Sequence, residues 1–111
     1  MKKNHIDLPT VGEVLWTEFM EPLALSQNAL AAAIGVPQNR ISDIINGKRG
    51  VTADTDLRLC RYFGMSNGFF TRIQNHLEQA LARRQIEKEL DEIIPHHHAN
   101  DNIGARQRMC A

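Results

Sequence analysis

The chain has 111 residues, 42% of them hydrophobic and 23% charged, which is enough for one small globular domain. Its 13 Lys and Arg residues balance 13 Asp and Glu residues, so bulk charge gives no support for nucleic-acid binding. Two cysteines exclude a disulfide framework, and no apolar run approaches the roughly 18–20 residues of a membrane span. The first residues lack the apolar stretch of a secretory signal. We therefore expect a cytoplasmic protein without a membrane segment.

The first two predicted elements are helices, because no segment alternates at the period of two that marks a strand. The apolar spacing from Val11 to Phe19 is that of one helix face, and Pro22 limits its extension. Ser26 is a suitable N-cap for a second helix over residues 27–34.

A third predicted helix follows a glycine turn. Gly35 stands just after the second helix, where a left-handed backbone favours glycine. The third helix runs from residue 37 or 38 to Ile45, and a proline is tolerated in its first turn.

Two further helices are predicted after this pair. Thr52 caps the fourth, which ends at Gly64, and Ser66 caps the fifth. The inward residues are expected to be Leu57, Cys60 and Phe63 in the fourth helix, and Phe70, Ile73, Leu77 and Leu81 in the fifth.

We divide the chain into four parts, of which only the polar tail after Pro95 is set apart by its composition. They are an N-terminal arm (1–8), a folded helical domain (9–82), a C-terminal helical extension (83–95) and a polar tail (96–111) that we expect to be disordered. Consecutive histidines at 96–98 invite a metal interpretation, but in such a tail they bind metal weakly and without selectivity. We therefore expect no metal site.

Two short helices joined by a glycine turn form the helix-turn-helix arrangement, whose second helix enters the DNA major groove. If Ile41, Ile44 and Ile45 turn inward, polar side chains occupy the other side of that helix. Amides bind adenine with two hydrogen bonds, an acidic side chain accepts from cytosine N4, and serine suits either kind of base edge. The expected base contacts are Gln38, Asn39, Ser42 and Asp43.

Basic and amide side chains flank that polar face and suit phosphate contacts, which position a protein without reading sequence. The expected phosphate contacts are Gln27, Arg40, Asn46, Lys48 and Arg49. A plainer alternative stays open, because the polar face of a short helical hairpin is often simply solvated. The Asp43 carboxylate also counts against DNA, since beside phosphates it must find a partner or be repelled.

Two apolar patches have no obvious place in one small core. They consist of Trp16 and Met20 in the first helix and of Ile86, Leu90 and Ile93 near the C-terminal end. Either the last helix bends near residues 83–84 and its end covers Trp16, or the patches contact a partner. We favour a homodimer contact, because helix-turn-helix proteins that bind DNA as dimers contact two half-sites about 34 Å apart through a two-fold interface.

Residues 36–49, taken with 57–64 and 69–74, resemble the XRE-type helix-turn-helix of lambdoid repressors. More narrowly, residues 9–13, 21–23 and 41–49 are similar to the HigA/VapI-type antitoxins of bacterial toxin–antitoxin modules. The resemblance covers about residues 9–82. It implies an all-α, five-helix lambda-repressor-like domain with an extended C-terminal helix.

By the same resemblance, Gln38, Asn39 and Asp43 fall at base-contact positions. Gln27, Asn46 and the loop 48–49 fall at phosphate-contact positions. The chain departs from the family pattern at Asp56, where alanine is common, at 67–68, where proline and an acid are common, and at Phe70, where tryptophan is usual. These departures lie away from the DNA face and leave the toxin's identity open.

The resemblance implies a dimeric antitoxin that binds double-stranded operator DNA, represses its own operon and neutralises a cognate toxin, expected to be a RelE-like mRNA interferase. No catalytic arrangement is legible from residue spacing, so we expect a non-enzyme without a cofactor. Two alternatives remain. One is a stand-alone XRE-type transcriptional regulator, and the other is a protein-interaction module whose helix-turn-helix does not contact DNA.

Overall fold

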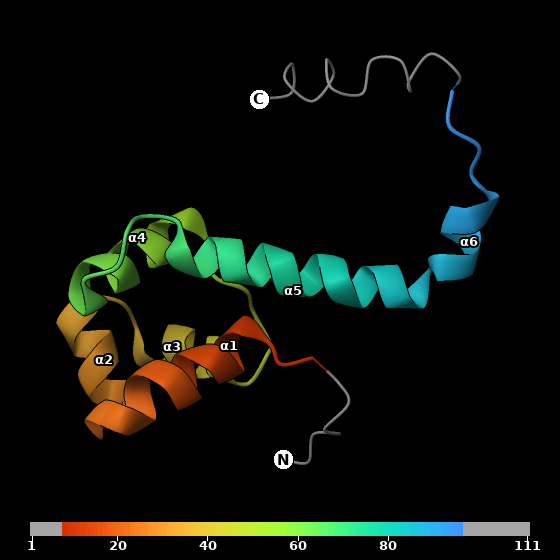
Figure 1. Cartoon of the computed structure of the whole chain (residues 1–111). Helices are drawn as coiled ribbons and strands as arrows, with labels where there is room; N and C mark the ends of the chain where they lie inside the picture. The colour runs from red at the N-terminus through yellow and green to blue at the C-terminus, as the bar shows by residue number, and fades with distance from the viewer. Residues whose placement is uncertain (1–7, 97–111) are drawn as a thin grey trace. The chain divides into compact units, whose positions relative to one another are not determined.

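The computed structural model describes residues 8–96, which form helices and connections without a β-strand (Figure 1). The predicted all-α fold is confirmed. Its elements are α1 (Val11–Val14), the π-helical η1 (Leu15–Met20), the 3₁₀-helical η2 (Glu21–Leu23), α2 (Gln27–Ile34), α3 (Gln38–Ile45), α4 (Ala53–Phe63), α5 (Phe69–Gln85) and α6 (Glu87–Glu92). The predicted arm lies mostly, and the predicted tail almost wholly, outside the described residues. No helix between Leu8 and His96 combines the length and hydropathy that a membrane crossing requires.

Two compact units make up the chain, one ending at Leu81 and the other beginning at Ala82. The core of the first unit is built from α1 to α5. Its fully or almost fully buried apolar residues are Val11, Leu15, Met20, Leu30, Ala31, Ile34, Ile41, Ile44, Val51, Leu59, Cys60 and Phe70. Phe19 joins this core to the start of α5 through an edge-on contact with Phe70, with ring centroids 5.0 Å apart.

The first helix begins with a reciprocal cap and then widens. Glu13 N–H donates to Thr10 Oγ1 and Thr10 N–H donates to Glu13 Oε1, each over 3.1 Å. From Leu15 the backbone is π-helical, so residues five apart lie nearly above one another. Met20 therefore follows Leu15 into the core, and both are fully buried.

The prediction that Met20 lies on an exposed contact patch is wrong. It assumed the regular α-helical turn of 100° per residue, which places Met20 away from Leu15. Trp16, the other member of that patch, is half-buried and packs against the core. The first helix therefore offers a smaller exposed apolar surface than its sequence indicated.

Gly12 allows α1 to pack directly on α3. It is buried, and a Cβ atom at this position would overlap the backbone carbonyl oxygen of Ile44. Only a residue without a side chain permits this separation of the two helices. Gly12 thus determines how closely α3 packs against α1.

The inward face of α4 differs in part from the prediction. Cys60 is buried as expected, but Leu57 is 48% exposed. The buried residues of α4 are Thr55, Asp56, Leu59 and Cys60, so two polar residues occupy core positions that an apolar pattern cannot reveal. The predicted ends of α4 are confirmed: Thr52 Oγ1 accepts from Thr55 N–H, and Gly64 has a left-handed backbone with φ +74°.

Asp56 supplies the cap of α5 from a neighbouring helix. Its carboxylate is 2% exposed and accepts hydrogen bonds from the N–H groups of Gly68 (2.7 Å), Phe70 (2.9 Å) and Thr71 (3.1 Å). A negative charge is favourable at a helix N-terminus, where N–H groups lack partners within the helix. The predicted N-cap Ser66 is wrong, because α5 begins only at Phe69.

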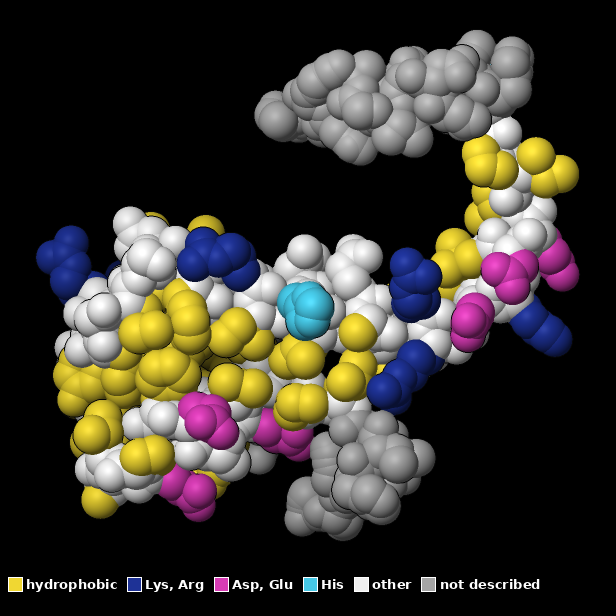
Figure 2. Space-filling view, viewed as in Figure 1, with side chains coloured by type: hydrophobic (Ala, Val, Ile, Leu, Met, Phe, Trp, Pro, Cys, Tyr) yellow, Lys and Arg dark blue, Asp and Glu magenta, His cyan; other side chains and the backbone are white. Residues whose placement is uncertain are grey.

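The second unit contains the end of α5 and the short helix α6. Ile86 interrupts the helix with φ −117° and ψ 20°, close to the bend expected at residues 83–84. Ile86, Leu90 and Ile93 are 43%, 38% and 64% exposed. Figure 2 shows apolar and acidic side chains next to one another on α6.

Candidate nucleic-acid interface

The turn between α2 and α3 has the predicted geometry. Ser26 Oγ accepts from Ala29 N–H at the start of α2, over 3.0 Å. Gly35 ends α2 with φ +74° and ψ 38°, and Val36 N–H closes the turn onto Ala31 O. A side chain in this left-handed conformation costs roughly 1–2 kcal/mol, which explains the glycine. The two helices are thereby fixed as a helix-turn-helix unit.

One side of α3 is buried and the other faces solvent. Ile41 and Ile44 are almost fully buried in the core. Gln38 and Asn39 are exposed in the first turn of the helix, and Ser42 and Asp43 are partly exposed further along. The four expected base-contact residues therefore share one helix and remain accessible, with the amides at the N-terminal end that reaches base edges in DNA-bound proteins.

The first residues of α2 and α3 meet. Gln38 Nε2 donates to Gln27 Oε1 over 3.4 Å, and neither side chain is buried. This contact leaves the Gln38 carbonyl and one of its N–H groups available to a ligand. The fold thus brings together Gln27, which is expected to contact a phosphate, and Gln38, which is expected to contact a base edge.

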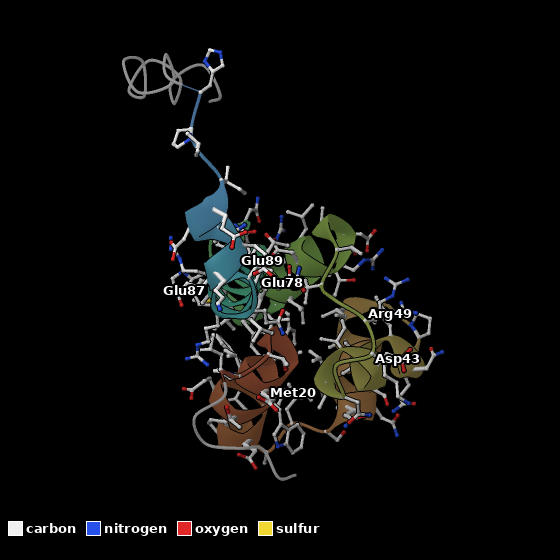
Figure 3. The ribbon with its side chains drawn as sticks, turned by 90° about the vertical axis from the view of Figure 1, so that its right-hand side faces the viewer. Met20, Asp43, Arg49, Glu78, Glu87 and Glu89 are labelled. Atoms are coloured by element: carbon white, nitrogen blue, oxygen red, sulfur yellow. The ribbon has the colours of Figure 1, made fainter. Side chains whose placement is uncertain are left out.

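Asp43 forms an ion pair with a basic residue, as a carboxylate near phosphates requires. Its Oδ2 lies 3.8 Å from Arg49 Nη2, and its backbone carbonyl accepts from the N–H groups of Lys48 and Arg49. Figure 3 shows Asp43 and Arg49 along the same edge of the domain. The ion pair lowers the electrostatic cost of placing this carboxylate beside phosphates, which answers the main objection from sequence.

The basic loop after α3 is held by an amide clamp from α5. Gln74 Oε1 accepts from Val51 N–H over 2.7 Å, and Gln74 Nε2 donates to Val51 O over 3.0 Å. The clamp fixes the loop just after the exposed residues Lys48 and Arg49. Gln74 lies in the stretch 69–74 that carries the family resemblance, but its clamping role was not predicted, because a glutamine on a helix is usually a solvated surface residue.

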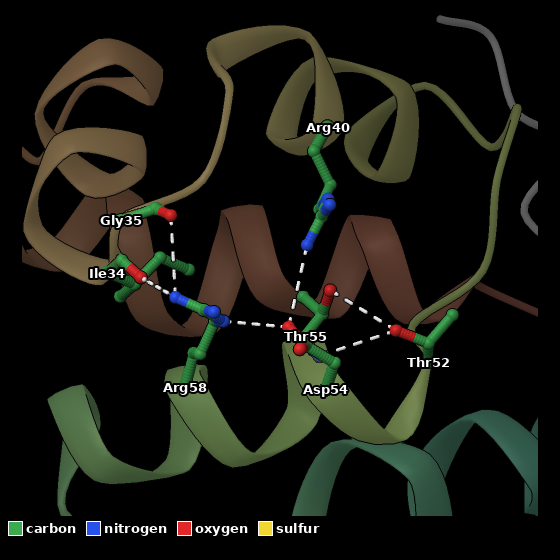
Figure 4. Close-up of polar contacts among 7 residues, drawn as sticks. All are labelled: Ile34, Gly35, Arg40, Thr52, Asp54, Thr55 and Arg58. Carbon is green, nitrogen blue, oxygen red and sulfur yellow. Dashed lines mark hydrogen bonds and ion pairs between the residues drawn. The ribbon is translucent and has the colours of Figure 1, made fainter.

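Arg40 links α3 to α4 through an ion pair (Figure 4). Its Nη1 lies 3.5 Å from Asp54 Oδ1, which also accepts from Arg58 Nε over 2.7 Å. Arg58 Nη1 in turn donates to Ile34 O (2.8 Å) and Gly35 O (3.4 Å), the carbonyls at the end of α2. This chain of contacts fixes α3, α4 and the turn to one another. These roles of Asp54 and Arg58 could not be predicted from sequence, because Asp54 contacts Arg40 on another helix and Arg58 contacts carbonyls 23 and 24 residues away.

Asn46 follows α3 at the protein surface. It ends the helix next to Gly47, whose left-handed backbone (φ +77°) turns the chain into the basic loop. Asn46, Lys48 and Arg49 therefore lie at the C-terminal end of α3, whereas Gln27 and Gln38 lie near its N-terminal end. Among the described residues, no group of three or more His, Cys, Asp or Glu side chains could hold a metal ion.

Comparison with known proteins gives consistent matches. The helix-turn-helix family HTH_3 matches residues 18–66. The chain is 39% identical over 93 residues to virulence-associated protein I of Dichelobacter nodosus, which covers 84% of this chain and 85% of the relative. It is 34% identical over 96 residues to antitoxin HigA-1 of Vibrio cholerae, which covers 86% and 90%.

A solved structure of the Pseudomonas aeruginosa antitoxin HigA with the higBA promoter has a TM-score of 0.71 and 34% identity, covering 78% of this chain and 94% of that one. Sequence relatives and fold agree over most of both lengths. The chain therefore belongs to the HigA/VapI-type antitoxins, a non-enzymatic XRE-type helix-turn-helix family of bacterial toxin–antitoxin modules.

Proposed function

We propose that this chain is a cytoplasmic, homodimeric antitoxin that binds its own operator DNA, represses its operon and neutralises a RelE-like toxin. The observation that carries the DNA part is the exposed face of α3, which presents polar side chains opposite Ile41 and Ile44. The relative from P. aeruginosa, solved with promoter DNA, supports the same use of the fold.

The side chains divide by role along this face. Gln38, Asn39, Ser42 and Asp43 contact base edges, because they lie on α3 and carry the groups that distinguish bases. Gln27, Arg40, Asn46, Lys48 and Arg49 contact phosphates around them. The ion pair with Asp54 competes with phosphate for Arg40, so Arg40 contributes less to the free energy of DNA binding than Lys48 does.

DNA from immediately upstream of the gene tests the operator proposal. A fluorescently labelled duplex of this sequence should bind about 10³-fold or more tightly than a shuffled duplex of the same composition, at 150 mM salt. Fluorescence anisotropy measures both affinities. Equal affinity for the two duplexes would contradict operator recognition and favour a protein-interaction module.

The toxin part rests on family membership and is tested separately. The gene next to this one should encode a small basic protein that co-purifies with the chain and stops growth when expressed alone. Absence of such a partner would favour the stand-alone regulator, whose α3 face would be the same.

The homodimer is proposed to use Ile86, Leu90 and Ile93, which remain exposed on the single chain. The double variant Ile86→Asp, Leu90→Asp should sediment as a monomer at micromolar concentration, because charges would be buried in an apolar interface. Circular dichroism should show unchanged helical content. The control Lys88→Asp places an acid on the other side of α6 and should stay dimeric. A double variant that remains dimeric would contradict this interface.

A further inference from the structure

A surface groove lies between α2 and α4 and has no role in the DNA face. It is lined by Ala33, Ile34, Leu57, Arg58, Arg61 and Tyr62, with a volume of about 550 Å³, and is called here the α2–α4 groove. Leu57 and Tyr62 are 48% and 43% exposed and line the same groove, and exposed apolar side chains that gather in one place, unlike scattered ones, are typical of interaction surfaces. The groove therefore offers an apolar floor bordered by two arginines.

The two arginines of the groove are not equivalent. Arg58 is engaged by Asp54 and by the carbonyls of Ile34 and Gly35. Arg61 lies one turn after Leu57 on the exposed side of α4 and forms no ion pair with another described residue. The groove thus presents one available cation beside an apolar surface, which fits an acidic amphipathic segment.

The segment around α6 has this chemistry. Leu90 follows Ile86 by one helical turn, and Ile93 directly follows the helix. At 100° per residue, Glu87 and Glu89 border the Ile86–Leu90 line on its two sides, and Figure 3 shows these carboxylates on opposite sides of α6. The residues of α6 comprise four acids and one lysine, Glu87, Glu89, Asp91, Glu92 and Lys88.

We propose that the α2–α4 groove of one copy holds the α6 of a second copy, and that the exchange is reciprocal. Leu90 and Ile93 cover Leu57 and Tyr62, and Glu89 or Glu87 pairs with Arg61. The proposal rests on the homodimer proposed above and names the surface that its α6 residues contact. It explains in one arrangement why both apolar surfaces are exposed on the single chain.

A two-fold arrangement makes this exchange feasible. The 17 residues of α5 span about 25 Å, and two such helices paired antiparallel place the end of one beside the start of the other. Helix α6 follows the end of α5, whereas Arg61 and Tyr62 precede its start by a short connection, residues 64–68. Antiparallel α5 helices therefore bring α6 of each copy toward the groove of the other.

Cysteine cross-linking between separately prepared variants tests the contact. Leu57→Cys and Leu90→Cys, each made in a Cys110→Ser background, are mixed, allowed to exchange subunits and oxidised. We expect a disulfide-linked dimer in the mixture at least tenfold above either variant alone. The matched control replaces Leu90→Cys by Lys88→Cys, on the other side of α6, and should give little product. A dimer that persists without the 57–90 cross-link would overturn the proposal.

A single chain carrying both cysteines distinguishes exchange from fold-back. A cross-link formed within one chain, with no linked dimer, would overturn the proposal in favour of a groove filled by the chain's own α6.

Charge reversal gives an independent readout. Arg61→Glu should weaken dimerisation about tenfold or more in sedimentation equilibrium, and adding Glu87→Arg and Glu89→Arg should restore it. Binding to a single operator half-site should not change, because Arg61 lies outside the DNA face. If Arg61→Glu leaves dimerisation intact but abolishes toxin binding, the groove is a toxin site and the proposal is wrong, while the DNA proposal stands.

Discussion

Replacing Asp56 with Ala should destabilise the domain by about 3 kcal/mol or more. The substitution leaves the N–H groups of Gly68, Phe70 and Thr71 without their acceptor in a largely buried place, and each unmet donor costs about 1–3 kcal/mol. For a domain of this size the melting temperature should fall by at least about 12 °C. Differential scanning calorimetry measures the change directly.

The matched control is Asp56→Asn, which keeps one acceptor oxygen and the shape of the side chain. It should lose less stability than Asp56→Ala, because part of the α5 cap survives. If Asp56→Ala melts within about 3 °C of the unchanged protein, the carboxylate does not hold the start of α5 as the structure indicates.

Replacing Gly12 with Ala should also destabilise the domain, against the usual trend. Gly→Ala in a helix normally stabilises by about 0.4–1 kcal/mol, because the unfolded chain loses freedom. Here the new methyl group would overlap the carbonyl of Ile44, so α1 and α3 must move apart. Overpacking of this kind typically costs about 1–3 kcal/mol.

The sign of the effect is therefore the test at Gly12. The urea concentration at the unfolding midpoint should be lower for Gly12→Ala than for the unchanged chain. Operator affinity should also fall, because α3 has shifted relative to α1. Ala32→Val, on the exposed side of α2, is the control for adding volume to a helix without a clash. A Gly12→Ala variant more stable than the unchanged chain would contradict direct packing of α1 on α3.

The local features of the helix-turn-helix could be predicted from sequence, because each depends on neighbouring residues. Ser26 as a cap and Gly35 as a left-handed turn follow from the chemistry of single positions. The helical spacing of isoleucines among polar residues in α3 likewise determines which side is buried. Periodicity and capping were sufficient for this part of the fold.

The errors arise where regular geometry or local pairing fails. The prediction for Met20 was wrong because η1 is π-helical, with hydrogen bonds that join residues five apart, and its sequence carries no signal of that wider turn. Leu57 was misplaced because Asp56 occupies the core position beside it. The contacts of Asp54 with Arg40, of Arg58 with the α2 carbonyls and of Gln74 with Val51 join residues far apart in the chain. Such pairs are visible only once the helices are placed.

The central claim is that α3 reads the operator while the loop after it binds phosphates. Its most direct test compares Gln38→Ala with Lys48→Ala on operator and shuffled duplexes between 50 and 200 mM salt, using fluorescence anisotropy. Gln38→Ala should lose about 1–3 kcal/mol of discrimination, or about 5- to 150-fold, with little change in salt dependence. Lys48→Ala should weaken binding to both duplexes alike and lower the salt slope by about 0.9. The same uniform loss from both variants would contradict the division of roles.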